Sequence, residues 1–206
     1  TYEESVLLDK DVDLLGAGSD RSIVFSDGDR ETLTLAGISD VAVSGLLLKG
    51  DGGLGMLINN CKNISVADVA SAEHGEGADY PGVGVYVFGS TGIELVGLDI
   101  RDNQIIGIAF SGSEATISSS NVESNGSGDS SAGILIDEGS NVQIGSSEPS
   151  ENNQDRDHDI VEEADVPSAT AEPGSDTPPE SASEATEMGG CAITGTEGVG
   201  ILVRQS

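Results

Sequence analysis

Few residues of this 206-residue chain could act as bases near neutral pH. Only 8 residues are Lys or Arg and two are His, against 37 Asp and Glu. Proton transfer requires a side chain whose pKa lies near the working pH, so these few residues are the first to examine. Lys49, His74, Arg101 and Asp102 form the candidate catalytic patch. A sequence repeat that runs along the chain is expected to bring these four residues close together.

Acidic residues beside this patch suggest two further kinds of chemistry. Asp99 and Asp102 could form the carboxylate pair of a glycoside hydrolase or supply oxygen ligands to Ca²⁺. Paired carboxylates are inevitable in so acidic a chain, and no EF-hand or nonapeptide calcium motif occurs. Zinc is not expected, because the two His and two Cys have no ligand spacing. We therefore expect no cofactor, with Ca²⁺ as the alternative.

The charge of the chain restricts its partners. A formal net charge of −29 disfavours nucleic acid, whose phosphates require clustered Lys and Arg. An acidic polysaccharide would be repelled unless divalent cations bridged it, whereas high salt would screen the self-repulsion. A saline, halophilic setting explains the acidity most simply. No stretch is long and apolar enough to span a bilayer.

A turn followed by apolar, polar and apolar residues recurs along the chain. The last residues of successive copies are separated by 29, 23, 29, 22 and 27 positions. The six copies are Lys10–Leu14, Ser39–Val43, Lys62–Val66, Thr91–Leu95, Ser113–Ile117 and Ser140–Ile144. A unit of this length cannot bury its apolar face alone, so successive units must stack.

Three other columns share the period of this repeat. Glycines that open apolar runs are Gly55, Gly84, Gly107, Gly133 and Gly200. Polar residues between two apolar columns are Asp13, Ala42, Ser65, Glu94, Thr116 and Gln143, and we expect them to point outward. Eight residues after each anchoring apolar residue stand Asp51, His74, Asn103, Asn125 and Asn152. Asparagines in one column predict a stacked amide ladder at a tight turn.

These columns predict an all-β fold. Stacking like positions at the strand spacing of about 4.8 Å gives a parallel solenoid of six to seven coils, with aliphatic ladders inside. A β-sandwich is the alternative for many short strands, but it predicts hairpin signals and no common register.

The register also brings the candidate site together. Lys49 and Arg101 fall in one column two coils apart, about 10 Å, which suits one or two sugar units. The residues expected to contact the substrate are Asp51, Glu73, Tyr80, Asp99 and Asn103. The competing interpretation is that these are turn residues whose opposite charges compensate one another at the edge of the stack.

The first coil resembles those of a known superfamily. The segment Thr1–Val6, running into Val12–Gly18, looks like the opening coil of pectin-lyase-like β-helix proteins, and the Gly-Ile and Asn-containing coils resemble their repeats. This resemblance implies a right-handed, single-stranded parallel β-helix over about residues 1 to 152, resuming near 189. For lyases of the superfamily, it implies a base that abstracts a proton and Ca²⁺ or Arg that neutralises the substrate carboxylate.

The signatures of the superfamily's best-known enzymes are absent. His74 lies in Glu-His-Gly, which departs from the Gly-His-Gly of polygalacturonases, and no Arg-x-Lys follows. The paired glutamines and Gly-Arg-Pro-Trp of pectin methylesterases are also missing. The sequence therefore favours a non-catalytic module over an enzyme.

An acidic segment interrupts the repeats. Residues 148 to 187 hold 13 acids and one base, and five of the six prolines lie between 147 and 188. Low hydrophobicity with high charge cannot offset the entropy of ordering. We expect β-helix coils over 1–152, a disordered acidic loop over 153–188, and a return to the final coil over 189–206.

Two kinds of covalent modification can be considered. Cys61 and Cys191 are three to four coils apart once the loop is discounted, or roughly 15 Å, which is too far for a disulfide, so each is expected to be a small buried residue. Asn63 and Asn125 lie in N-glycosylation sequons.

Together these features suggest a structural or carbohydrate-binding module of an exported, extracellular, cell-surface or periplasmic protein, and part of a longer chain. The expected partner is a polysaccharide or cell-surface glycan, and neither nucleic acid nor a membrane span is expected. A polysaccharide lyase, hydrolase or epimerase is the alternative. A NosD-like accessory role in periplasmic metal handling ranks last.

Overall fold

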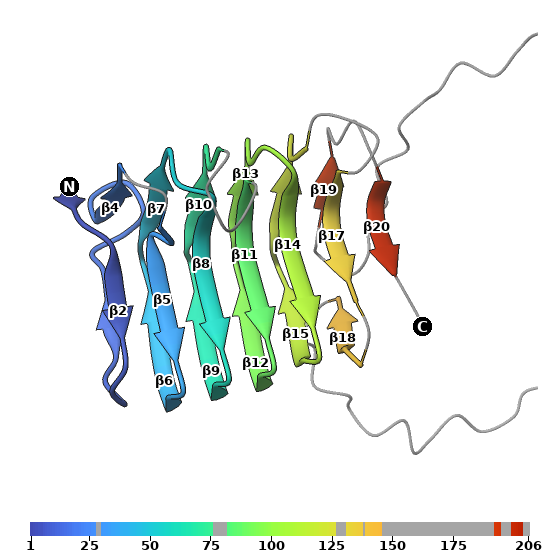
Figure 1. Ribbon diagram of the computed structural model, residues 1–206, viewed down its shortest axis with the longest axis horizontal. Coiled ribbons are helices and arrows are strands. Elements are labelled where there is room, and N and C mark those ends of the chain that lie inside the picture. Colours follow the sequence, from blue (N-terminus) through green and yellow to red (C-terminus); the bar gives the residue numbers. More distant parts are fainter. Residues whose placement is uncertain are drawn as a thin grey trace, which may run out of the picture.

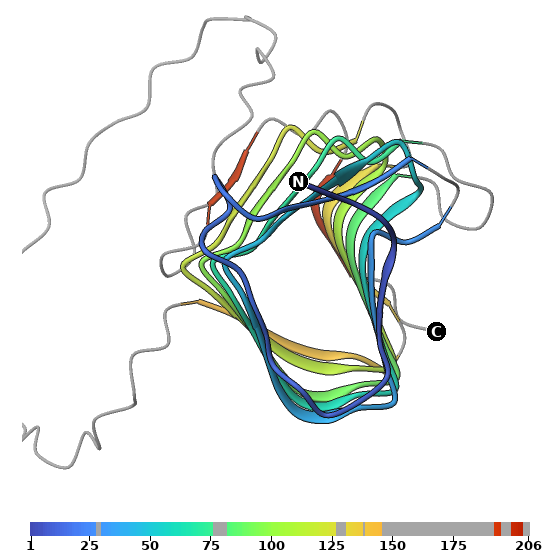
Figure 2. The ribbon, with the colours of Figure 1, turned by 90° about the vertical axis from the view of Figure 1, so that its left-hand side faces the viewer.

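A computed structural model describes residues 1–27, 30–75, 82–126, 131–137, 139–145, 192–194 and 199–203. These residues form short strands that stack side by side in parallel along one axis (Figure 1). Viewed along that axis, the successive coils superpose around a common interior (Figure 2). Within the described residues there is no helix, as the short apolar runs separated by turn residues predict.

Within the described residues, successive coils contribute their strands to three parallel sheets. Sheet A has seven strands, β1 (Tyr2–Glu3), β4 (Ile23–Ser26), β7 (Leu47–Gly50), β10 (Ala70–Ala72), β13 (Asp99–Arg101), β16 (Asn121–Glu123) and β19 (Ala192–Thr194). Sheet B has seven, β2 (Val6–Leu8), β5 (Leu33–Ala36), β8 (Leu54–Asn59), β11 (Val83–Phe88), β14 (Ile106–Ser111), β17 (Ala132–Ile136) and β20 (Val199–Val203). Sheet C has six, β3 (Leu14–Leu15), β6 (Ser39–Ser44), β9 (Lys62–Ala67), β12 (Thr91–Val96), β15 (Glu114–Ser118) and β18 (Asn141–Ile144).

The predicted all-β parallel solenoid is therefore confirmed. The turn-plus-apolar pattern forms sheet C, where Val43 pairs with Val66 and Val66 with Leu95. The acidic loop expected over 153–188 lies outside the described residues. After it, β19 pairs with β16 and β20 with β17, so the chain continues the same stack.

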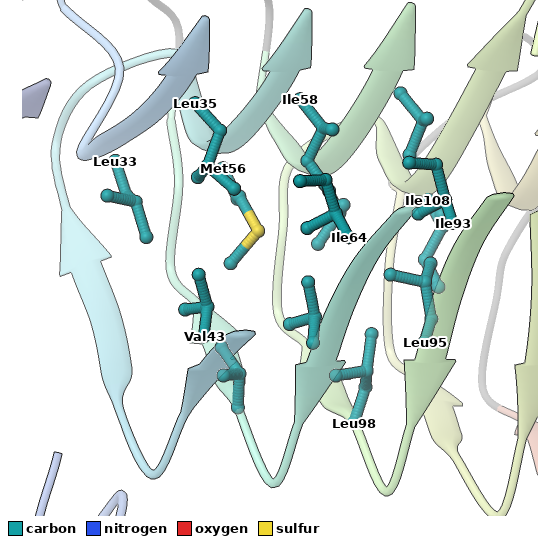
Figure 3. Packing of buried hydrophobic residues seen from close by; sticks show 14 of the residues in the cluster. Leu33, Leu35, Val43, Met56, Ile58, Ile64, Ile93, Leu95, Leu98 and Ile108 are labelled. Carbon is teal, nitrogen blue, oxygen red and sulfur yellow. The ribbon is translucent and has the colours of Figure 1, made fainter. Parts of the chain in front are cut away.

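Aliphatic side chains fill the interior of the solenoid. Figure 3 shows Val43, Ile64, Ile93 and Leu95 from sheet C facing Leu35, Met56, Ile58 and Ile108 from sheet B. Val, Ile and Leu suit these positions because their branched side chains pack well on a pleated surface. Burying one such side chain stabilises the fold by about 1.5–3 kcal/mol, so the stacked columns supply the main driving force.

A buried ladder of polar side chains runs between sheets A and B. The amide of Asn103 donates to Asn125 Oδ1 at 2.8 Å, and the Asn125 amide donates to the Ile100 carbonyl at 2.8 Å. The backbone N–H of His74 donates to Asn103 Oδ1 at 3.4 Å. The predicted amide ladder is thus confirmed for the two coils of Asn103 and Asn125, and the coil before them joins it through the backbone N–H of His74. Asp51 leaves it, because its side chain is exposed, and Asn152 lies outside the described residues.

The glycine column makes room for this ladder. A Cβ at Gly84 would come within 2.7 Å of Asn103 Nδ2, Gly107 O and Ile100 Cγ2. Gly107 faces Asn125 in the same way, with a Cβ position 2.9 Å from Asn125 Nδ2. The glycines recur at the period of the ladder because any larger side chain would displace the stacked amides.

Candidate functional site

The predicted charged patch lies on the outer face of sheet A. Lys49 and Arg101 both pair in register with Ala72, so they occupy one column two coils apart, as the repeat predicts. Lys49 Nζ lies 2.7 Å from Glu73 Oε1, and Arg101 Nε lies 3.0 Å from Asp99 Oδ2. The hydrogen bond from Arg101 to Asp99, followed by the charge of that carboxylate, raises the pKa of Arg101. Each cation of the patch therefore already has an anionic partner.

His74 does not face this patch. Its side chain is 1% exposed. Burial lowers the pKa of His74 from 6.5 to about 4, although the backbone groups of Leu48 and Gly52 and the charge of Glu73 act in the opposite direction. His74 is thus an uncharged residue buried beside the ladder. A proton acceptor for a polysaccharide must be reachable from the surface, and the buried ring of His74 is not.

The other predicted substrate contacts separate into three groups. Glu73 and Asp51 are exposed in the turns that follow strands of sheet A, and Asp99 is half-buried at the start of β13. The catalytic candidate Asp102 is exposed in the turn that follows β13. Asn103 is buried in the ladder, where no sugar can reach it without opening the stack. Tyr80 lies outside the described residues.

The weak calcium interpretation gains no support from the described part of the chain. Asp99 Oδ2 accepts the hydrogen bond from Arg101, so its oxygen is already engaged. Among the described residues, no group of three or more His, Cys, Asp or Glu side chains is arranged to hold a metal ion.

The two sequons differ in accessibility. Asn125 is 0% exposed and its amide is bonded within the ladder, so it is inaccessible to a glycosyltransferase in the folded chain. Glycosylation of Asn125 stays a prediction. Asn63 is exposed on sheet C, where its amide donates to Asp40 Oδ1 at 3.0 Å. Cys61 is buried, as predicted, whereas Cys191 lies outside the described residues.

A groove with a volume of about 390 Å³ runs over the outer face of sheet C, and repeat analysis alone did not identify it. An adjoining hollow of about 340 Å³ shares three of its residues. The outward side chains that line the groove are Asn63, Ser65, Glu94, Glu114, Thr116, Asn141 and Gln143. These residues come from four successive strands, β9, β12, β15 and β18. The groove therefore follows the solenoid axis.

The outward polar column predicted from the sequence forms the centre of this groove. Ser65 pairs with Glu94, Glu94 with Thr116, and Thr116 with Gln143. Hydroxyl, carboxylate and amide groups thus follow one another at the spacing between neighbouring strands, about 4.8 Å. The alternation of polar and apolar residues was the signal for these side chains, but it did not show that the face is hollow.

The described residues contain no helix that is long and apolar enough to cross a membrane. In comparisons with known proteins, no curated protein and no solved structure gave a significant match. The family model described as "right handed beta helix region" matches residues 19–155, which is more than half of the chain. With its three parallel sheets wound into one solenoid, this chain belongs to the right-handed β-helix family.

Proposed function

We propose that the chain is a non-catalytic, carbohydrate-binding β-helix module of an exported or cell-surface protein, and that a linear polysaccharide binds in the groove on sheet C. The single observation that supports this function most strongly is the groove itself. It presents exposed hydrogen-bonding groups on four successive strands, which suits a ligand with repeated hydroxyl groups.

Electrostatics support the same proposal. The net charge of −29 is compatible with an exported protein in a saline medium, where salt screens the self-repulsion of the surface.

The groove can be tested by removing hydrogen-bonding groups without disturbing the core. Thr116→Leu/Gln143→Leu alters two exposed side chains in the centre of the groove. Each lost hydrogen bond is worth about 1 kcal/mol, so we expect the double variant to bind the polysaccharide about tenfold or more weakly. Calorimetric titration against a panel of neutral, acidic and amino polysaccharides, with and without Ca²⁺ in high salt, measures the change.

A matched control is available on another sheet. Thr34→Leu makes the same change at a residue of β5 on sheet B, which does not line the groove. Its affinity for the polysaccharide should equal that of the parent chain. Equal affinities of all three proteins would exclude the groove as the binding surface.

The second candidate function is a polysaccharide-active enzyme that uses the patch on sheet A. Arg101 and Lys49 lie two coils apart in one column, which favours this candidate. We expect the parent chain to release neither unsaturated nor reducing ends from the same panel, because both cations are paired and His74 is buried. If products do form, Arg101→Ala should abolish their release while circular dichroism shows an intact fold, and such a result would favour the enzyme.

A further inference from the structure

The groove on sheet C carries charge of one sign. Glu94 and Glu114 both line it and are exposed. Neither carboxylate forms an ion pair with another described residue. No Lys, Arg or His is among the residues that line the groove. Among the described residues, the formal charges that line the groove are therefore negative.

The two carboxylates occupy separate positions along the groove. Glu94 pairs in register with Thr116, and Glu114 precedes Thr116 by two residues on the same face of β15. Neighbouring strands are about 4.8 Å apart and two residues of a strand span about 6.8 Å, so the Cα atoms of Glu94 and Glu114 are roughly 8 Å apart. The two carboxylates are thus offset both along and across the strands, so that two amines on one polymer could each contact one of them.

Amide and hydroxyl groups occupy the rest of the groove. Asn63 and Ser65 lie at one end, and Asn141 and Gln143 lie at the other. Such neutral groups donate to and accept from sugar hydroxyls. The two carboxylates are therefore the described groups of the groove that would respond to the charge of a sugar.

We propose that the groove selects a linear polysaccharide that carries free amino groups, and that Glu94 and Glu114 determine this specificity. This inference rests on the proposed function, in which the groove binds a polysaccharide. An ammonium group gains Coulomb energy beside either carboxylate, whereas a uronate is repelled and a neutral sugar gains nothing from the charges. Charge complementarity thus favours an amino sugar over a neutral or an acidic one.

The test compares two oligosaccharides with the same backbone, one with free amines and one with acetylated, uncharged nitrogens. A β-1,4-linked glucosamine hexamer and its N-acetylated counterpart are titrated into the full chain at 0.15 M salt and at 1 M salt. We expect the glucosamine hexamer to bind at least about tenfold more tightly at the lower salt, and the preference to decrease at the higher salt as screening strengthens.

Two variants with equal net charge separate local from long-range attraction. Glu94→Gln/Glu114→Gln neutralises the groove, and Glu3→Gln/Glu4→Gln removes the same two charges from exposed positions in the first coil. The groove variant should lose the preference for the amino sugar and still bind the N-acetylated hexamer with the parent affinity, to within about twofold. The first-coil variant should keep the preference.

Each remaining outcome contradicts the proposal in its own way. An equal loss of preference in both variants would show that the overall negative charge, not the groove, attracts the amine. Binding of the N-acetylated hexamer as tight as that of glucosamine would leave the groove a polysaccharide site without the proposed selectivity. No binding of either hexamer, together with polysaccharide binding that is insensitive to Thr116→Leu/Gln143→Leu, would overturn the proposed function as well. Polylysine that binds the groove as tightly as the glucosamine hexamer would point to a basic peptide instead.

Discussion

Replacing Gly84 with alanine should destabilise the chain by about 3 kcal/mol or more. The new Cβ would lie 2.7 Å from the Gly107 carbonyl oxygen and 2.7 Å from Asn103 Nδ2, so the backbone or the ladder must shift. Overpacking of a core typically costs about 1–3 kcal/mol, and a displaced Asn103 would also lose buried hydrogen bonds. Chemical denaturation followed by circular dichroism measures the loss of unfolding free energy.

Gly145 provides the matched control for this change. Its Cβ position has no neighbouring atom within 4 Å, and its φ lies outside the left-handed region, so Gly145→Ala should change stability by less than about 0.5 kcal/mol. Equal unfolding free energies for the two alanine variants would show that the ladder does not require glycine at position 84, and would contradict the steric argument.

The acid sensitivity of the fold should depend on His74. Its pKa is about 4 in the folded chain and 6.5 when exposed, so the unfolded chain binds the proton more tightly. The stability associated with a neutral His74 is therefore fully present above pH 6.5 and is lost as the pH falls toward 4. One pKa unit corresponds to 1.36 kcal/mol, so the loss amounts to about 3 kcal/mol over this window.

The variant His74→Asn isolates this contribution from that of the carboxylates, which also titrate in acid. Asparagine does not titrate. In the ladder, the Asn103 amide donates to the Ser71 carbonyl, and Leu48 is in register with Ser71 one coil earlier. An asparagine at position 74 would therefore place its amide toward the carbonyl of Leu48 in the same way. We expect the parent chain to lose about 3 kcal/mol more than this variant between pH 7 and pH 4. Unfolding curves at each pH give the comparison, and His158→Asn measures the contribution of the second histidine. Parallel pH profiles for the parent chain and His74→Asn would contradict the burial of a neutral ring.

Much of the fold could be predicted because the same pattern of apolar and polar residues occurs in several successive coils. A residue in a parallel stack has like neighbours above and below, so the apolar column through Val43, Val66 and Leu95 must recur at the coil period. The same logic predicted the column that joins Lys49 to Arg101 and the amides of Asn103 and Asn125.

Side-chain direction at the turns was harder to predict. Glu73 and Asp102 have φ values of 63° and 56°, in the left-handed region, and the side chain that follows each of them is buried. Nothing in the residue types at 73 or 102 requires that backbone conformation, because it is more usual for glycine or asparagine. His74 therefore looked like a surface base by its chemistry and like a ladder member by its register, and only the backbone decided between them.

The sequence alone thus determined the parallel stack, its register and the outward polar column of Ser65, Glu94, Thr116 and Gln143, because stacking forces like positions into contact. Tertiary structure alone decided that the face bearing this column is a groove, that His74 is buried and that Lys49 and Arg101 are paired. The physical reason is that periodicity reports which residues are neighbours along the stack. The curvature of a sheet and the rotation of a side chain at a turn depend on backbone angles that the spacing of residues does not encode.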